Sequence, residues 1–184
     1  MRLGLFGGTF DPIHQGHIHL IQQILDRNMV DEVLVVPAGN PWMRSDGPVA
    51  SAMDRLAMVE LALSDLPARV KSRVGVCECE VRRSGPTYTI DTVEELHGSR
   101  PDVAIVLILG SDAAAQIDKW HRSAELRNLV EVLIIARDGE GLDIDALDLS
   151  STKVRQELLT HHGVTGDIPA NVLTYIKEHN LYAS

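Results

Sequence analysis

The chain has 184 residues, 45% of them hydrophobic, a formal net charge of −9 at pH 7 and two cysteines. This length suits one α/β domain, so we expect a single domain over residues 1–184. No apolar run reaches the ~18 residues of a membrane span. The acidic balance argues against a general nucleic-acid or membrane-surface binder. Because a strand is expected from residue 2, no signal peptide is predicted, and we expect a cytoplasmic protein.

Short apolar runs alternate along the chain with segments of helical periodicity. Strands are expected at residues 2–6, 32–36, 74–81, 103–109 and 130–136, and helices at 17–27, 50–64, 89–97, 111–117 and 123–128. A connector over 138–148 precedes two C-terminal helices, from 150 onward and from 168 to about 179. The alternation predicts an α/β fold with a doubly wound, mostly parallel, five-stranded sheet. Ligands bind such sheets beyond the carboxyl ends of the strands.

The segment Gly7–His17, GGTFDPIHQGH, links the first strand to the first helix. Gly7 and Gly8 allow a sharp turn and close approach of the backbone to a ligand. The helix start directs N–H groups and the positive end of the dipole toward an anion. His14 and His17 are three residues apart and share a helix face, where imidazoles can donate to phosphoryl oxygens. The loop is neither a dinucleotide G-x-G-x-x-G nor a Walker A motif. The alternative is a tight turn followed by solvated histidines.

The segment 150–155, SSTKVR, is a second candidate phosphate site at a helix start. The hydroxyl groups of Ser151 and Thr152 can cap free N–H groups and offer short donors to an anion. Arg155 lies one turn after Ser151 and can make a forked contact with phosphate oxygens. Taken alone, the pattern is equally typical of a capped helix with an exposed arginine.

Three further motifs follow predicted strands. Gly110 and Asp112, in GSD, end the most apolar strand, where a carboxylate can hold ribose hydroxyls. Trp120, in KWHR, suits stacking on a heteroaromatic ring. The segment 85–92, GPTYTIDT, starts a helix and can present N–H and O–H donors to a carboxylate. Each has a structural alternative, as a helix cap or as packing.

The motif Gly7–His17 resembles the H-x-G-H nucleotidylyltransferase superfamily, whose members join a nucleoside monophosphate unit to a phosphate-bearing acceptor. The segment 150–155 matches the superfamily's C-terminal S-S-T-x-h-R signature, in which h is apolar. The segment 85–92 is similar to the G-P-[ST]-Y-T-x-[DQ]-T pattern of the bacterial nicotinate mononucleotide adenylyltransferases. The resemblance covers nearly the whole chain and implies a Rossmann-like nucleotidylyltransferase fold with C-terminal helices.

The resemblance implies a Mg²⁺-dependent transfer of the adenylyl group from ATP to nicotinate mononucleotide, with deamido-NAD and pyrophosphate as products. It makes His17, His14 and Arg155 catalytic, with His17 at the α-phosphate and the other two at the β- and γ-phosphates. Mg²⁺ would be held mainly by the ATP phosphates and water, because no carboxylate cage is evident. The other implied ATP-binding residues are Gly7, Gly8, Thr9, Phe10, Asp11, Gly110, Asp112, Arg137, Ser151 and Thr152.

In the nicotinate enzymes the tryptophan stacks on the pyridine ring and the 85–92 loop meets the pyridine carboxylate. This chain departs from the family pattern V-P-x-x-x-P-P-H-K at Trp42 and Met43, and from R-P-G at Asp138. The implied acceptor-binding residues are Asn40, Arg44, Thr87, Tyr88, Thr89, Trp120 and His121.

Several alternatives stay open on the sequence alone. Phosphopantetheine and nicotinamide mononucleotide are alternative acceptors, and a nucleotide-binding regulator without catalysis is an alternative of another class. The presence of His14, His17 and Arg155 argues against the regulator. ATP and the acceptor are the expected partners, without nucleic acid polymer or membrane, and the sequence leaves a homo-oligomer open.

Overall fold

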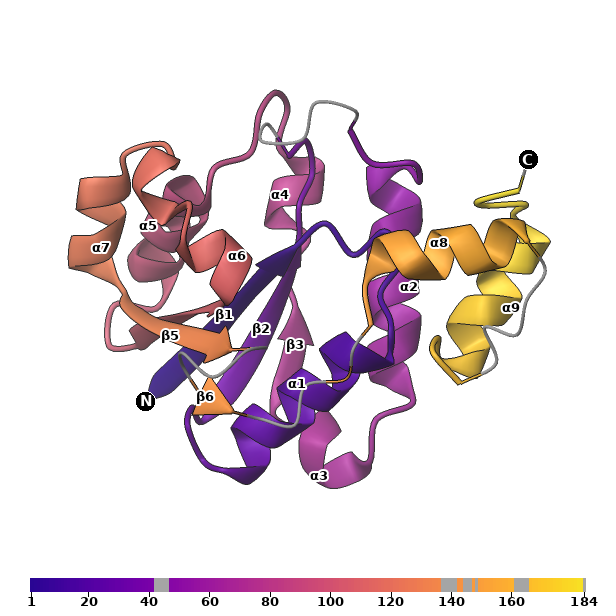
Figure 1. Ribbon diagram of the computed structural model, residues 1–184. Helices are drawn as coiled ribbons and strands as arrows, with labels where there is room; N and C mark the ends of the chain where they lie inside the picture. Colours follow the sequence, from indigo (N-terminus) through magenta and orange to yellow (C-terminus); the bar gives the residue numbers. More distant parts are fainter. Residues whose placement is uncertain (42–46, 137–141, 144–146, 148, 161–165, 184) are drawn as a thin grey trace.

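The computed structural model describes residues 1–41, 47–136, 142–143, 147, 149–160 and 166–183. Its centre is a six-stranded sheet in which every neighbouring pair of strands is parallel (Figure 1). The chain steps outward from β1 in one direction and then from β4 in the other, which is the Rossmann strand order. In spatial order the strands are β3 (Val74–Val76), β2 (Glu32–Pro37), β1 (Arg2–Gly8), β4 (Ala104–Gly110), β5 (Glu131–Ala136) and β6 (Leu142–Asp143).

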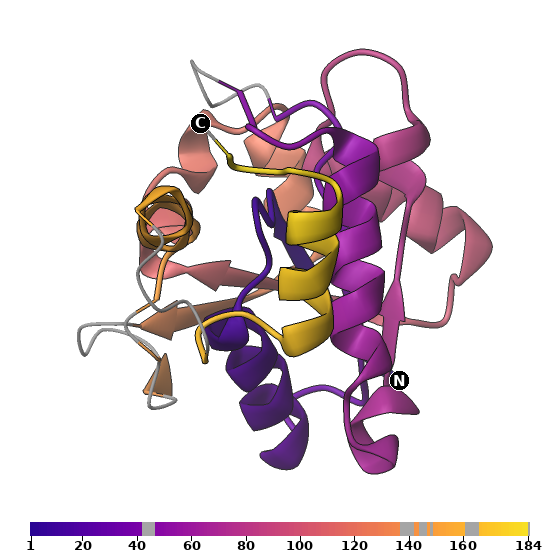
Figure 2. The ribbon, with the colours of Figure 1, turned by 90° about the vertical axis from the view of Figure 1, so that its right-hand side faces the viewer.

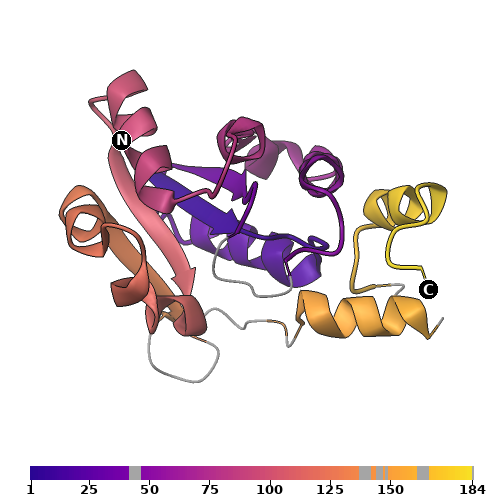
Figure 3. The same ribbon diagram turned by 90° about the horizontal axis from the view of Figure 1, so that it is seen from above.

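Helices cover both faces of this sheet, as Figures 1 and 3 show. One face packs against α1, α2 and α9, and the other against α5 and α7. In Figure 2, α9 lies alongside α2. The helices are α1 (Gln15–Asp26), α2 (Ala52–Ser64), α3 (Ala68–Lys71), α4 (Cys79–Arg82), α5 (Thr89–Ser99), α6 (Ser111–Ala114), the 3₁₀ helix η1 (Ile117–Lys119), α7 (Ser123–Leu129), α8 (Ser151–Leu159) and α9 (Ala170–Glu178).

The two core layers follow from strand alternation. In β1, Leu5 faces the α5/α7 layer and Phe6 the α1/α2 layer. In β4, Leu107 likewise faces the α5/α7 layer and Ile108 the α1/α2 layer. Both faces of the central strands are therefore buried. The predicted α/β fold with a doubly wound parallel sheet is therefore confirmed. The described helices include none with both the length and the apolar character needed to cross a bilayer.

Three local predictions were wrong. The strand expected over 74–81 ends at Val76, because residues 79–82 turn into α4, where Glu78 and Arg82 form an i,i+4 ion pair at 2.7 Å. The helix expected over 111–117 is divided into α6 and η1. The two-residue β6 lies within the expected connector, adding a sixth strand.

Because β3 ends early, the two cysteines do not share a strand: Cys79 begins α4, and Cys77 precedes it. Both are free thiols. The backbone N–H of Cys79 donates to the Cys77 sulfur across 3.4 Å. A hydrogen bond from the Cys79 side chain lowers the pKa of the Cys77 thiol to about 7, whereas the pKa of Cys79 is raised.

Candidate active site

Two cavities open at the carboxyl ends of the central strands, where the strand order reverses between β1 and β4. The histidine cavity, about 180 Å³, is lined by His14, Gly16, His17 and Gly110, among others. The tryptophan cavity, about 240 Å³, is lined by residues that include Thr87, Tyr88, Thr89, Trp120 and His121. Gly7 and Gly8 line both cavities. Two ligand groups held in these cavities would therefore meet at the first loop.

The start of α1 fixes the two histidine rings in the histidine cavity. His14 precedes the helix and His17 lies in its first turn, so their rings stack with centroids 3.7 Å apart. The backbone N–H of His14 donates to His17 Nδ1 across 3.2 Å. A neutral His17 ring therefore carries its proton on Nε2 and can donate from that nitrogen. The edge of Phe10 against the His17 ring, 5.0 Å between centroids, restricts the ring further.

Gly16, between the two histidines, is required by the packing of the His14 ring. A Cβ atom at this position would lie 3.0 Å from His14 Nδ1. That approach is tighter than ordinary van der Waals contact, so any side chain would displace the ring. The glycine of the H-x-G-H motif therefore has a steric reason that does not depend on any ligand.

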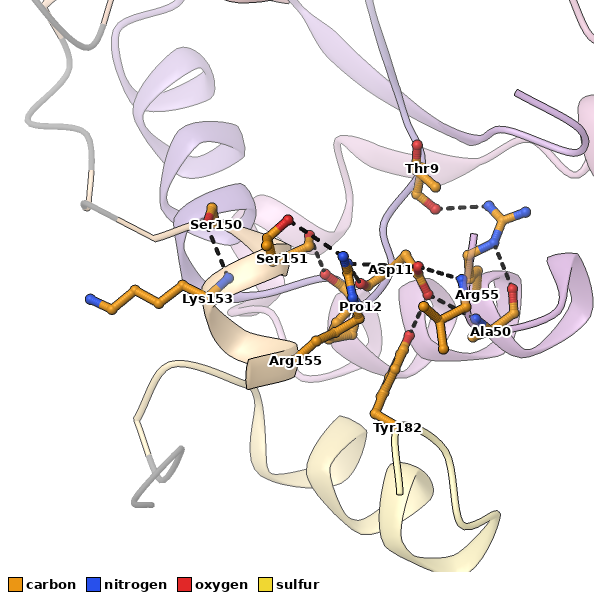
Figure 4. A network of polar contacts seen from close by, with 12 residues as sticks. Thr9, Asp11, Pro12, Ala50, Arg55, Ser150, Ser151, Lys153, Arg155 and Tyr182 are labelled. Atoms are coloured by element: carbon orange, nitrogen blue, oxygen red, sulfur yellow. Dashed lines mark hydrogen bonds and ion pairs between the residues drawn. The ribbon is translucent and has the colours of Figure 1, made fainter. Parts of the chain in front are cut away.

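Asp11 is a predicted ATP-binding residue whose carboxylate contacts other parts of the protein. It is 1% exposed. Its two carboxylate oxygens accept hydrogen bonds from the backbone N–H groups of Val49 (2.8 Å) and Ala50 (3.0 Å) (Figure 4). The carboxylate thereby ties the first loop to the segment that leads into α2.

Arg55, which was not among the predicted site residues, is fully buried beneath the same loop. Its guanidinium donates to the carbonyl oxygens of Thr9 (2.8 Å), Gly39 (2.9 Å) and Ala50 (3.3 Å). These bonds join the loops that follow β1 and β2. A sequence signal existed: Arg55 falls at helical spacing with Val59 and so on the buried face of α2.

The helix α8 docks directly on the first loop, although the two segments are far apart in sequence. Ser150 caps the helix by accepting from the N–H of Lys153 (3.2 Å), and the Ser151 hydroxyl donates to the Pro12 carbonyl (2.9 Å). Arg155 Nη1 donates to the Asp11 carbonyl across 2.7 Å (Figure 4). The structure thus brings the two predicted phosphate motifs together.

In the tryptophan cavity, the predicted acceptor loop is tied to the loop after β2. The N–H and hydroxyl of Thr87 both approach the Asn40 carbonyl, at 3.2 and 3.4 Å. Thr87 therefore uses its own N–H within the protein. The candidate donors for a bound carboxylate are the N–H groups of Thr89 and Ile90 at the start of α5, because the N–H of Asp91 already donates to the Tyr88 carbonyl across 3.1 Å.

Aromatic rings form the other wall of this cavity. The rings of Tyr88 and His121 stack with centroids 4.3 Å apart. Trp120 is half-buried and packs against the apolar layer under α5 and α7. The indole ring therefore packs against the core and also lines the cavity.

The remaining predicted residues divide into two groups. Gly110 lines the histidine cavity, and Asp112 is exposed in the adjoining α6. Arg44 and Arg137 lie outside the described residues, as do the departures at Trp42, Met43 and Asp138.

Glu80, also missed from the sequence, is a buried acid in the wall of the tryptophan cavity. Its Oε1 atom accepts a hydrogen bond from the Thr92 hydroxyl at 3.0 Å. Burial raises the pKa of the Glu80 carboxyl above its usual value. In the strand-like alternation of residues 74–81, nothing marked Glu80 as different from Glu78.

Glu80→Gln is expected to raise the melting temperature at pH 7–8 and to leave it unchanged near pH 4. Because the folded-state pKa is raised, the carboxyl group destabilises the fold once pH exceeds its unfolded value of about 4.3. The destabilisation is complete above the raised pKa. Glutamine has no charge and keeps an oxygen for Thr92. Each 1 kcal/mol corresponds to about 2–4 °C in a chain of this size.

Thermal unfolding followed by circular dichroism between pH 4 and 8 tests this expectation. Glu60→Gln, which changes an exposed acid on α2, is the matched control and should show no such pH-dependent gain. An equal loss of stability at every pH in Glu80→Gln would contradict the assignment of a buried, destabilising charge.

Comparison with known proteins agrees with this geometry. Residues 5–157 match the family model described as cytidylyltransferase-like, and the chain belongs to this family of nucleotidyltransferases. Within the family it groups with the nicotinate-nucleotide adenylyltransferases. A Dehalococcoides mccartyi (strain CBDB1) protein named "Probable nicotinate-nucleotide adenylyltransferase" is 36% identical over 99% of this chain and 97% of its own length. A Leifsonia xyli subsp. xyli protein of the same name is 38% identical over 100% and 94%.

Solved structures support the fold. The Plasmodium falciparum nicotinic acid mononucleotide adenylyltransferase complexed with NaAD superposes with a TM-score of 0.82 at 23% identity, over 98% of this chain and 97% of that chain. The same enzyme complexed with APC gives a TM-score of 0.79 at 22% identity, over 98% and 96%. The family model and the curated relatives together confirm the predicted family resemblance.

Proposed function

We propose that this chain transfers the adenylyl group of ATP to nicotinate mononucleotide, forming deamido-NAD and pyrophosphate. The observation that carries the proposal is the pair of cavities joined at Gly7 and Gly8. One has a phosphate-binding character, from the histidine pair and the start of α1, and the other has an aromatic wall beside the start of α5. The relatives above have the same activity in their names.

The reaction needs positioning more than covalent chemistry. An oxygen of the acceptor's phosphate attacks the α-phosphorus of ATP, and the bond from that phosphorus to the bridging oxygen of the β-phosphate breaks, releasing pyrophosphate. The attacking phosphate is already anionic at neutral pH, so no general base is required. Catalysis then rests on alignment and on stabilising the charge that moves to the leaving oxygens.

In this proposal His17 donates from Nε2 to the α-phosphate in the transition state, and His14 and Arg155 contact the β- and γ-phosphates. The support for His17 is its fixed ring: the bond from the His14 backbone holds the proton on Nε2. The support for Arg155 is its place beside Asp11, at the edge of the first loop. The hydroxyls of Ser151 and Thr152 lie next to it on α8.

We propose that Mg²⁺ arrives with ATP as part of the substrate. Among the described residues, no group of three or more His, Cys, Asp and Glu side chains is arranged to hold a metal ion. Phosphate oxygens and water suit Mg²⁺, which usually keeps several waters. The ion would neutralise charge on the leaving pyrophosphate.

A coupled pyrophosphate assay with ATP, Mg²⁺ and one acceptor at a time tests the function. We expect turnover with nicotinate mononucleotide to exceed that with nicotinamide mononucleotide, and none with phosphopantetheine. Turnover with phosphopantetheine alone would overturn the acceptor assignment. ATP binding without pyrophosphate release for any acceptor would favour a regulatory protein instead.

A further inference from the structure

The C-terminal tail, residues 179–183, reaches the first loop through a buried hydrogen bond. The Tyr182 hydroxyl donates to Asp11 Oδ1 across 2.7 Å, and the Tyr182 side chain is buried (Figure 4). The tail folds back after α9 through Asn180 and Tyr182, whose φ values of 51° and 59° lie in the left-handed region. Non-glycine residues seldom adopt that region, so the fold tolerates backbone strain to place this ring.

The same aspartate faces Arg155. Arg155 Nη1 donates to the Asp11 carbonyl and lies 3.7 Å from Asp11 Oδ2. The carboxylate already accepts from the Val49 and Ala50 backbone, and Tyr182 supplies its third donor. A buried carboxylate must be satisfied by donors, and one that loses a donor attracts the nearest cation more strongly. Arg155 is close enough to respond.

We propose that Tyr182 is a positioning residue of the ATP site: by satisfying the Asp11 carboxylate, it leaves the Arg155 guanidinium available to ATP phosphates. This inference rests on the proposed function of the site. Burial and the bond to Asp11 raise the pKa of the Tyr182 hydroxyl, so it stays protonated and remains a donor. Without that donor, Arg155 is drawn onto Asp11 and contacts ATP less well.

Tyr182→Phe tests the proposal because it removes the hydroxyl and keeps the ring. We expect the KM for ATP to rise by roughly five- to ten-fold, the scale of one typical intramolecular hydrogen bond. The KM for the acceptor should stay within about two-fold, because the acceptor loop is not part of this network. Calorimetric affinity for ATP without acceptor should fall by the same factor.

Tyr175→Phe is a matched control. The Tyr175 hydroxyl donates to Asp54 Oδ1 at 3.0 Å and joins α9 to α2, so it is a second C-terminal tyrosine–aspartate bond placed outside both cavities. A purely structural role for Tyr182 predicts that both variants lose thermal stability and keep the wild-type KM for ATP. Equal KM values for ATP in Tyr182→Phe and Tyr175→Phe would therefore overturn the proposal.

A double-mutant cycle with Arg155→Ala tests whether Tyr182 acts through the arginine. If it does, Tyr182→Phe should change ATP affinity by less than about two-fold in the Arg155→Ala background. Additive effects would contradict the proposal, even if Tyr182→Phe were poorly stable. A wild-type protein that fails to bind ATP or to release pyrophosphate would contradict the proposed function itself, whereas unchanged ATP affinity in Tyr182→Phe refutes only this inference.

Discussion

His17→Ala is expected to lower kcat by about 10²–10³, the effect of removing one transition-state donor, or ~2.7–4 kcal/mol. The His17 ring is held by the His14 backbone, by ring stacking on His14 and by the edge of Phe10. This rigidity aligns Nε2 before the reaction begins, so little reorganisation is needed when charge moves. The KM for ATP should change far less, because the loop backbone and Arg155 remain.

Steady-state kinetics at saturating nicotinate mononucleotide measure both parameters. His19→Ala is the matched control, since His19 lies on the same helix and lines neither cavity. It should retain nearly normal turnover. A folded His17→Ala protein with near-wild-type kcat would remove His17 from the chemistry and leave it as part of the loop's packing.

The sequence was most informative where function depends on contiguous residues. The glycines, histidines and serines of the two phosphate motifs are determined by backbone turns and helix starts, which are local properties. Their mutual approach followed from a general rule, that ligands bind at the carboxyl ends of parallel strands. The contact of Arg155 with Asp11 agrees with that expectation.

The partners of the supporting residues could not be found in this way. Arg55, Glu80 and Tyr182 contact loops that come from distant parts of the chain, and their importance arises only from burial. A buried charge or hydroxyl requires partners, but the sequence does not say which segments provide them. The incorrect strand prediction across α4 has the same cause. An alternating pattern predicts a strand, but tertiary contacts determine the backbone conformation that forms.

Close packing beside α4 shows how tertiary contacts determine local structure. A Cβ atom on Gly39 would lie 2.0 Å from the carbonyl oxygen of Glu80. The backbone of the loop after β2 therefore rests directly on the start of α4. Only a glycine permits this approach, which keeps Glu80 in the cavity wall. In the sequence, Gly39 falls in a predicted loop, but nothing there indicates its partner.

Trp120→Ala is expected to weaken nicotinate and nicotinamide mononucleotide alike, by roughly 1–3 kcal/mol of stacking. The acceptor's pyridine ring would stack on the indole, which lines the cavity beside Tyr88 and His121. Acid and amide share this ring, so the loss is common to both. The preference for the acid should survive, because the charge-sensitive donors belong to the start of α5 rather than to the indole.

Tyr88→Gly is the complementary variant for the same test. Tyr88 immediately precedes α5 and stacks on His121, so glycine there loosens the helix start. It should reduce the preference for acid over amide more than it reduces affinity for either. Apparent KM and kcat for both acceptors at saturating ATP provide the comparison. If Trp120→Ala leaves both acceptors unaffected, the indole serves the apolar layer beneath it, and the acceptor assignment rests on the 85–92 loop alone.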